Sequence, residues 1–247
     1  MTKKKTKTRK KILTVILGVL VVAVVVAANV LHSNSTVQDI EVKIDYQGSD
    51  TLIDAAQTAA LIAEAMPRLR ATKLRDVNLE GVEKAAARSP YLEKCEASTS
   101  ISGAVVLYAV QRRPIVRIMI GASEYYLDKE GHRMPVSKRG DCNVIVAGGN
   151  IPDKGKGLEE VVTLARFLDE HEQYTPLFDQ IYRNEKGDLY LTPKLGSHVV
   201  LVGPAENLEE KFRNLMVFYT QGLPLAGWDT YSQVNLKYRG QVVGTRK

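Results

Sequence analysis

The sequence predicts an α+β protein with three parts: a single N-terminal transmembrane helix, a β-α-α-β-β module, and a mixed β domain with two helices. Three observations lead to this prediction. A basic tail precedes one long uncharged apolar run, several stretches alternate apolar and polar residues as half-buried strands do, and four stretches carry helix signals. With 247 residues, 45% of them hydrophobic and 25% charged, the chain can form one large or two small domains behind the apolar run.

The charge of the chain is concentrated at its N-terminus. The formal net charge is +6, but residues 1–11 hold seven lysine or arginine residues and no acid, so the remainder carries −1. A nucleic-acid binder needs its basic residues on the folded body. We therefore expect no nucleic-acid partner.

Residues 12–31 are predicted to form a transmembrane helix. They are 20 consecutive uncharged residues, 14 of them Val, Leu or Ile, and a helix of that length spans roughly 30 Å, one hydrocarbon core. The run is longer than the apolar region of a typical signal peptide, so we expect an uncleaved anchor over the two alternatives, a cleaved signal peptide and a buried core helix. By the positive-inside rule the tail at 1–11 is cytoplasmic, and residues 32–36 link the span to an extracytoplasmic body.

The first module is predicted at residues 37–121. Periodicity, helix caps and prolines place its elements in the order β-α-α-β-β, with a tight turn at Ser102-Gly103 before the last strand. The elements are a strand at Val37–Tyr46, helices at Asp54–Met66 and Asn78–Ser89, and strands at Glu93–Ile101 and Ala104–Ile120.

The second module is predicted at residues 122–247 as a mixed β domain. Short strands and hairpins alternate with two amphipathic helices, and an alternating stretch closes the chain as a strand. In chain order we expect a helix over Leu158–Leu168, a hairpin of Ile181–Asn184 with Asp188–Thr192, a strand at His198–Val202, a helix over Leu208–Tyr219 and a last strand at Tyr231–Thr245.

No catalytic, metal-binding or cofactor-binding motif is complete. His171-Glu172 begins like a zinc motif but lacks the second histidine four residues on. Asp128 and Glu130 flank a turn signal and are interpreted as solvated turn residues and not as an acid/base pair. The cysteines Cys95 and Cys142 are 47 positions apart in different predicted domains, so we expect them to be dispensable. We therefore expect a protein that is not an enzyme and has no cofactor.

Four motifs follow one another in the second half of the chain. They are Tyr126-Leu127-Asp128-x-x-Gly131, Gly187-Asp188-Leu189-x-Leu191, Val199-x-Leu201-x-Gly203 with Lys211 on the next helix, and Val234-Asn235-Leu236-Lys237-Tyr238-x-x-Gln241-Val242-Val243. Behind a basic tail, one span and a β-α-α-β-β module, their order and spacing resemble the FtsQ/DivIB family of bacterial cell-division proteins.

This resemblance implies a polypeptide-transport-associated (POTRA) domain at 37–121 and a β domain at 122–247, neither of them enzymatic. It implies a bitopic scaffold of the inner (cytoplasmic) membrane at the division septum, with an extracytoplasmic (periplasmic) body that binds FtsB and FtsL and links septum assembly to septal peptidoglycan synthesis. The turn at residues 45–50 departs from the apolar-Gly-Asn turn common in relatives. Partner contacts of the small module are therefore not carried over.

The last strand is the predicted partner-binding element. It contains no proline from Tyr231 to Gly244, although natural sheets usually protect an exposed edge with prolines or charges. We expect it to recruit a strand of FtsB by β-augmentation. The expected contact residues are Tyr238, Gly240, Val242, Val243 and Gly244. The alternative is that this strand is paired on both sides.

A second class of function is also considered. An anchored envelope enzyme or ligand sensor could have a site whose residues are too scattered for the sequence to reveal. It would need a concave site with convergent titratable groups, whereas a scaffold needs an exposed sheet edge.

The charge asymmetry around the span gives a first testable prediction. An alkaline phosphatase reporter fused after Lys247 should be active, because residues 1–11 hold the N-terminus in the cytoplasm and the body is exported. A reporter that works only in the cytoplasm, such as an unexported fluorescent protein, is the control at the same position. Activity of the cytoplasmic reporter alone would contradict the predicted topology.

Overall fold

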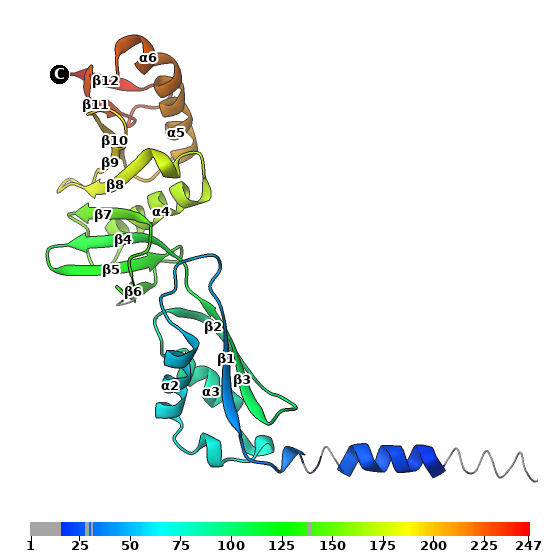
Figure 1. Cartoon of the computed structure of the whole chain (residues 1–247). Coiled ribbons are helices and arrows are strands. Elements are labelled where there is room, and N and C mark those ends of the chain that lie inside the picture. The colour runs from blue at the N-terminus through cyan, green and yellow to red at the C-terminus, as the bar shows by residue number, and fades with distance from the viewer. Residues whose placement is uncertain (1–15, 28–29, 31, 138–139) are drawn as a thin grey trace, which may run out of the picture. The chain divides into compact units, whose positions relative to one another are not determined.

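The computed structural model describes residues 16–27, 30, 32–137 and 140–247 (Figure 1). The chain forms two compact units: the first holds Ile53–Gln111 and the residues up to Asp45, and the second holds Tyr46–Leu52 and Arg112–Lys247. Each unit combines a sheet with helices. The predicted α+β class is therefore confirmed.

The N-terminal segment is described only in part. The basic tail at 1–11 and residues 12–15, 28–29 and 31 of the predicted span lie outside the described residues, while residues 16–27 are helical. Among the residues that the structure describes, no helix is long and apolar enough to cross a membrane.

The first unit is a three-stranded sheet with two α-helices. The sheet order is β1-β3-β2, with β1 parallel and β2 antiparallel to the central β3. This confirms the predicted order β-α-α-β-β. The elements are β1 (Asp39–Asp45), α2 (Ala55–Ala65), the 3₁₀ turns η1 (Leu69–Ala71) and η2 (Leu74–Asp76), α3 (Leu79–Ala86), β2 (Leu92–Thr99) and β3 (Ala104–Gln111).

Local sequence signals fix both helices of this unit. Asp54 and Gln57 form a reciprocal capping box at the start of α2, and the Asn78 side chain accepts a hydrogen bond from the Gly81 N–H at the start of α3. Alternate residues of β3, such as Leu107, are fully buried against the helices. Because β3 is the central strand, it is apolar almost throughout.

The predicted strand Ala104–Ile120 is in fact two strands. β3 ends at Gln111, and β4 begins at Pro114 in the second unit. Gln111 is completely buried, and its side chain accepts a hydrogen bond from the Ile53 N–H within the first unit. The apolar pattern continues on both sides of Arg112-Arg113, so periodicity cannot reveal that the chain changes sheets there.

The second unit is one nine-stranded sheet of order β12-β11-β10-β9-β8-β7-β4-β5-β6. The pairs β4–β7, β7–β8 and β10–β11 are parallel and the others antiparallel. Its strands are β4 (Pro114–Ile120), β5 (Ser123–Asp128), β6 (Arg133–Pro135), β7 (Ile145–Gly149), β8 (Phe178–Arg183), β9 (Leu189–Pro193), β10 (Val199–Gly203), β11 (Tyr231–Asn235) and β12 (Val243–Arg246).

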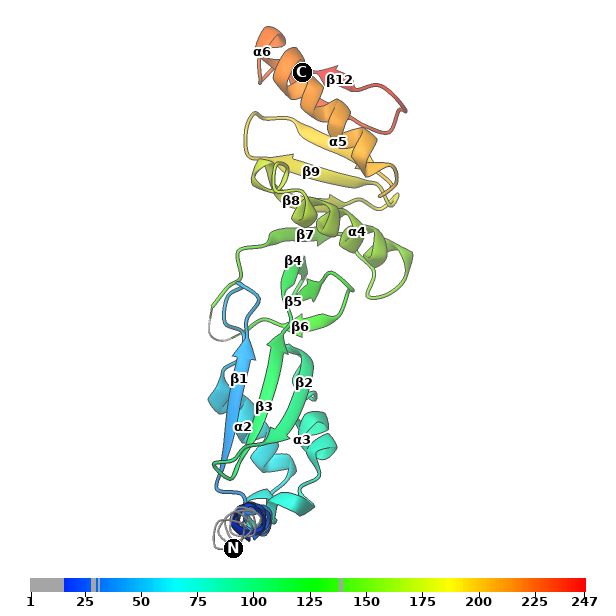
Figure 2. The same cartoon turned by 90° about the vertical axis from the view of Figure 1, so that its right-hand side faces the viewer.

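The helices of this unit cover one face of the sheet. Figure 2 shows α4 and α5 over the same face, where the rings of Phe167 of α4 and Phe212 of α5 pack at an angle with centroids 4.8 Å apart. Both lie in one continuous core with the inward residues of the strands. The helical elements are α4 (Lys156–Glu170), the 3₁₀ turn η3 (Thr175–Leu177), α5 (Leu208–Val217), a π-helix η4 (Phe218–Gly222) and α6 (Leu223–Ala226).

Asp128 is a buried structural acceptor. Its carboxylate lies 2.7 Å from Arg112 Nη1 and accepts hydrogen bonds from the backbone N–H groups of Glu130 and His132. The interpretation of Asp128 as a solvated turn residue is therefore wrong. A turn sequence predicts the bend but does not show that Arg112, sixteen residues earlier, covers the carboxylate.

Removing this carboxylate should destabilise the second unit. We expect Asp128→Ala to lower its free energy of unfolding by about 3–5 kcal/mol, because a nearly buried arginine and two turn N–H groups lose their partner. Urea unfolding followed by the fluorescence of Trp228, the single tryptophan, measures this. Glu130→Ala, an exposed carboxylate of the same turn, is the control. A loss no larger than the control's would contradict this role.

Candidate partner-binding edge

The second sheet has two outer strands that differ in how they are protected. β6 has three residues and ends in Pro135, two devices that discourage strand addition. β12 has four residues, no proline, and β11 as its only neighbour in the sheet. Within the part of the chain that the structure describes, β12 is thus the less protected edge of this sheet.

The predicted last strand, Tyr231–Thr245, is a hairpin and not one strand. β11 and β12 pair antiparallel, and residues 236–242 connect them. Gly240 has a left-handed φ of 71°, which glycine adopts without strain, and its N–H donates to Glu210 of α5. The Asn235 side chain accepts from the Lys237 N–H and starts the turn. Residues 234–239 alternate apolar and polar residues as a strand does, because a turn and the exposed face of a strand both place polar residues in the sequence.

The free backbone groups of β12 can be assigned from one hydrogen bond. The Lys247 N–H donates to the Thr230 carbonyl, toward β11. Because successive N–H groups of a strand point in opposite directions, those of Val243 and Thr245 also point toward β11. The N–H groups of Gly244 and Arg246 therefore point away from the sheet, where an added strand would pair.

The ring of Tyr231 occupies the space that a side chain at residue 244 would need. A Cβ at Gly244 would lie 2.5 Å from the ring of Tyr231, which itself packs edge-on against Phe218 with ring centroids 5.5 Å apart. A shallow hollow adjoins this pair, lined by Val217, Phe218, Gly240, Gln241 and Val242 among others. A strand added to β12 would place alternate side chains next to this apolar surface.

The opposite face of the sheet offers a second apolar surface at the same edge. The register of the strands aligns Tyr182, Tyr190, Leu201, Asn235 and Val243 in one row across β8 to β12. Tyr182 and Val243 are 46% and 40% exposed. A residue of an added strand opposite Val243 would extend this row, so both faces of that strand would meet apolar neighbours.

The structure separates the five predicted contact residues into two groups. Val243 and Gly244 lie in β12, and Val242 directly precedes it. Tyr238 and Gly240 lie in the connecting turn, where Tyr238 is 53% exposed. The edge as a partner site remains a prediction, now centred on residues 242–246.

Three contributors to the edge were not predicted from the sequence. Phe218 and Tyr231 build the aromatic pair, and Arg246 supplies an outward N–H. The glycine at 244 was the only local signal, since a glycine within a strand often marks the close approach of another group.

A buried polar pair supports the π-helix behind the edge. His198, 2% exposed, places Nε2 2.8 Å from the Tyr219 hydroxyl, and Tyr219 packs against Trp228 with ring centroids 5.5 Å apart. Burial lowers the pKa of His198 and raises that of Tyr219. Both are therefore neutral near pH 7.

One cavity of the second unit has its two cations paired with acids. It measures about 730 Å³ at the beginnings of β4, β7 and β8. Arg113 holds Asp169 with two hydrogen bonds of 2.6 Å, and Lys194 lies 3.7 Å from Asp179. Burial raises the pKa of the Cys142 thiol to about 11, so it is protonated and a poor nucleophile at neutral pH.

Two comparisons place the chain among known proteins. The family model described as FtsQ/DivIB, C-terminal related, matches residues 113–245. The cell division protein FtsQ of Salinibacter ruber is 27% identical over 188 residues, which cover 70% of this chain and 72% of that protein.

The buried His198 makes the stability of the second unit depend on pH. Its folded-state pKa lies below the value of about 6.5 in an unfolded chain, so unfolding takes up a proton below that pH. The contribution of neutral His198 to the free energy of unfolding is complete above pH about 6.5. It declines as the pH falls toward the folded-state pKa, by at most about 1.4 kcal/mol per pH unit.

Urea unfolding followed by Trp228 fluorescence between pH 7.5 and about 5.5 measures this effect. His198→Gln should flatten the dependence of the free energy of unfolding on pH. The control is His171→Gln, which should keep this dependence, because the His171 imidazole lies 2.9 Å from Glu209 and does not take part in the buried pair with Tyr219. An unchanged slope in His198→Gln would contradict the assignment.

Proposed function

We propose that this protein, which belongs to the FtsQ/DivIB family, is a non-enzymatic bitopic scaffold of bacterial cell division that binds FtsB- and FtsL-type proteins and links septum assembly to septal peptidoglycan synthesis. Family membership and the similarity to a cell division protein of Salinibacter ruber support the cell-division role. The observation that carries the scaffold function is the weakly protected strand β12 between two apolar surfaces.

The anchor at residues 12–31 is part of this proposal. Its described residues support it: the isoleucine, leucine and valine side chains of the helix at 16–27 are each 53–64% exposed. A helix that is apolar all round and not buried in a protein core is suited to a bilayer. The protein would then sit in the inner membrane at the septum, with its tail in the cytoplasm and both units outside.

The partner strand would join the sheet beyond β12. Main-chain hydrogen bonds from the outward N–H groups of Gly244 and Arg246 would supply affinity. Specificity would come from its side chains, because one face lies beside Tyr231 and Phe218 and the other continues the row that ends at Val243. We assign this strand to FtsB, as the family resemblance implies.

The alternative, an anchored envelope enzyme or ligand sensor, is less well supported. The 730 Å³ cavity has the size of a ligand site, but its arginine and lysine are each engaged by an aspartate and its thiol has a raised pKa. The family match also points to a division protein that is not an enzyme.

Proline substitution at Arg246 tests the proposed edge. We expect Arg246→Pro in the full-length protein to lower capture of FtsB at least about tenfold, because it removes an outward N–H and places a ring where the added strand would lie. Pull-down from detergent-solubilised membranes, with quantification of bound FtsB, measures this.

Arg246→Ala is the matched control, because it shortens the same side chain and keeps the N–H; it should retain capture within about threefold. Circular dichroism and Trp228 fluorescence verify that both variants are folded. A folded Arg246→Pro protein that captures FtsB as well as Arg246→Ala does would refute the edge as the binding site.

A further inference from the structure

We propose that the first unit carries a surface that binds the headgroups of anionic phospholipids in the membrane that holds the anchor. The surface consists of the loop at residues 68–76, between α2 and α3, and the tip of the β2–β3 hairpin at residues 100–103. The inference rests on the proposed membrane anchorage, and it adds a lipid contact that the scaffold function does not require.

Backbone hydrogen bonds tie this loop to the chain that would emerge from the bilayer. The Leu74 N–H donates to the Ser35 carbonyl at 2.9 Å, and Thr36 pairs with Lys73 as an antiparallel bridge. Ser35 follows Leu31, the end of the predicted span, by only four residues, a reach of at most about 14 Å. The loop is therefore held close to the membrane surface wherever the rest of the unit points.

The loop is basic and exposed. Four of the eight residues from 68 to 75 are exposed cations: Arg68, Arg70, Lys73 and Arg75. Arg70 pairs with Asp39 at 3.1 Å and Arg75 with Asp76 at 3.5 Å, in ion pairs whose side chains are all more than half exposed. Neither Arg68 nor Lys73 forms an ion pair among the residues that the structure describes. These two charges are available to an anion.

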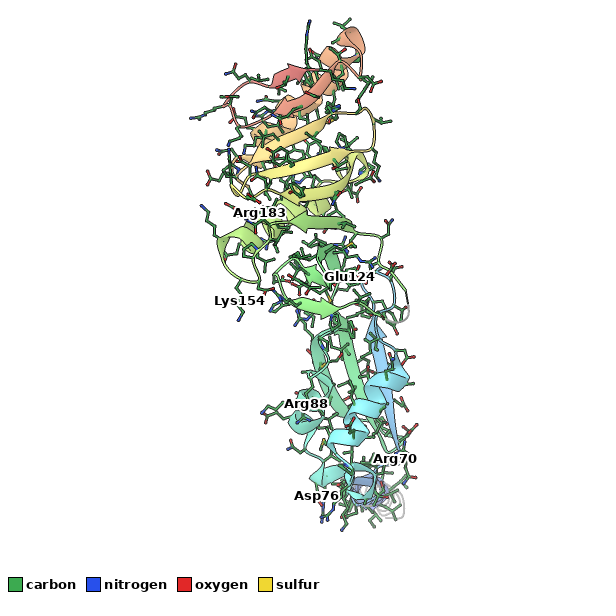
Figure 3. The ribbon with its side chains drawn as sticks, turned by 90° about the vertical axis from the view of Figure 1, so that its left-hand side faces the viewer. Arg70, Asp76, Arg88, Glu124, Lys154 and Arg183 are labelled. Atoms are coloured by element: carbon green, nitrogen blue, oxygen red, sulfur yellow. The ribbon has the colours of Figure 1, made fainter. Side chains whose placement is uncertain are left out.

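Two buried leucines hold the loop in shape. Leu69 in η1 and Leu74 in η2 are 3% and 6% exposed in the core of the unit. The buried leucines hold the backbone of the loop, and its four cations face solvent. Figure 3 shows Arg70 and Asp76 at the same end of the first unit and Arg88 farther from that end.

The hairpin tip adds an apolar contact at the same end. Ile101 is 95% exposed, and its neighbours Ser100, Ser102 and Gly103 are uncharged. His32 Nε2 lies 3.2 Å from the Ser100 carbonyl oxygen, and His32 directly follows the predicted span. An exposed isoleucine is ordinary elsewhere on a protein, but here it is held beside the point where the chain would leave the bilayer.

The expected effect follows from charge and tethering. Each lysine or arginine near an anionic membrane contributes about fivefold to binding, within a Debye length of about 10 Å. Because the anchor keeps the loop near the surface, docking is an intramolecular step. The two cations without ion pairs should shift the ratio of docked to undocked molecules about 25-fold toward docking on anionic lipid.

The test uses the full-length protein reconstituted in vesicles of phosphatidylcholine alone or of phosphatidylcholine mixed with phosphatidylglycerol. A fluorophore at Ile101→Cys reports docking through quenching by a headgroup spin label. Labelling is selective, because Cys142 is buried, Cys95 is half-buried, and burial raises the pKa of both thiols. We expect strong quenching in the anionic vesicles, and a loss of it in high salt.

The double substitution Arg68→Gln with Lys73→Gln should lower the docked-to-undocked ratio on anionic vesicles about 25-fold. The matched control, Arg88→Gln with Lys94→Gln, removes two exposed cations of the same unit away from the loop and should leave the ratio unchanged. Equal quenching on both lipids, or no effect of the loop variant, would overturn the proposal. Quenching that required an added acidic protein would also overturn it.

Failure of the anchor is recognised separately. A carbonate wash that releases the chain from the vesicles would contradict the proposed membrane function itself. A chain that resists the wash and captures FtsB, but shows no quenching at residue 101, would contradict the lipid surface alone.

Discussion

Backbone N–H and C=O groups need hydrogen-bond partners, and this requirement determines how the strands of the second unit are arranged. Seven of its nine described strands have a neighbour on both sides, and the two outer strands, β6 and β12, have one each. At one end, β6 is short and closed by Pro135. At the other, α5, the π-helix and α6 carry the chain from β10 to the parallel β11, and the turn at Gly240 returns β12 outside it. The edge at β12 therefore results from the order of the whole sheet.

Several side chains pack around β12 and behind it. Tyr231 lies across Gly244 and against Phe218. The hydrogen bond between His198 and Tyr219 holds the π-helix against the sheet. An ordered edge loses less conformational entropy when a partner binds than a flexible one does. The residues that shape the edge thus include the buried pair His198 and Tyr219.

Several polar residues of the second unit form contacts within it. Asp128 binds Arg112 and two turn N–H groups, and Lys237 donates to Asp188 across the sheet. Arg113 engages Asp169 of α4. Each contact joins segments far apart in the chain. These polar groups are therefore engaged in contacts within the second unit.

Local interactions determined what the sequence could predict. The cap at Asn78, the β8–β9 hairpin turn and the helical spacing of α4 and α5 depend on neighbours in the chain, and the structure confirms them. Tertiary structure decided what depends on distant residues: the break at Arg112-Arg113, the burial of Asp128, and the folding of residues 231–246 into a hairpin. The apolar and polar pattern is the same on either side of such a break or turn, so only pairing with distant strands determines where a strand ends and which one lies at the edge.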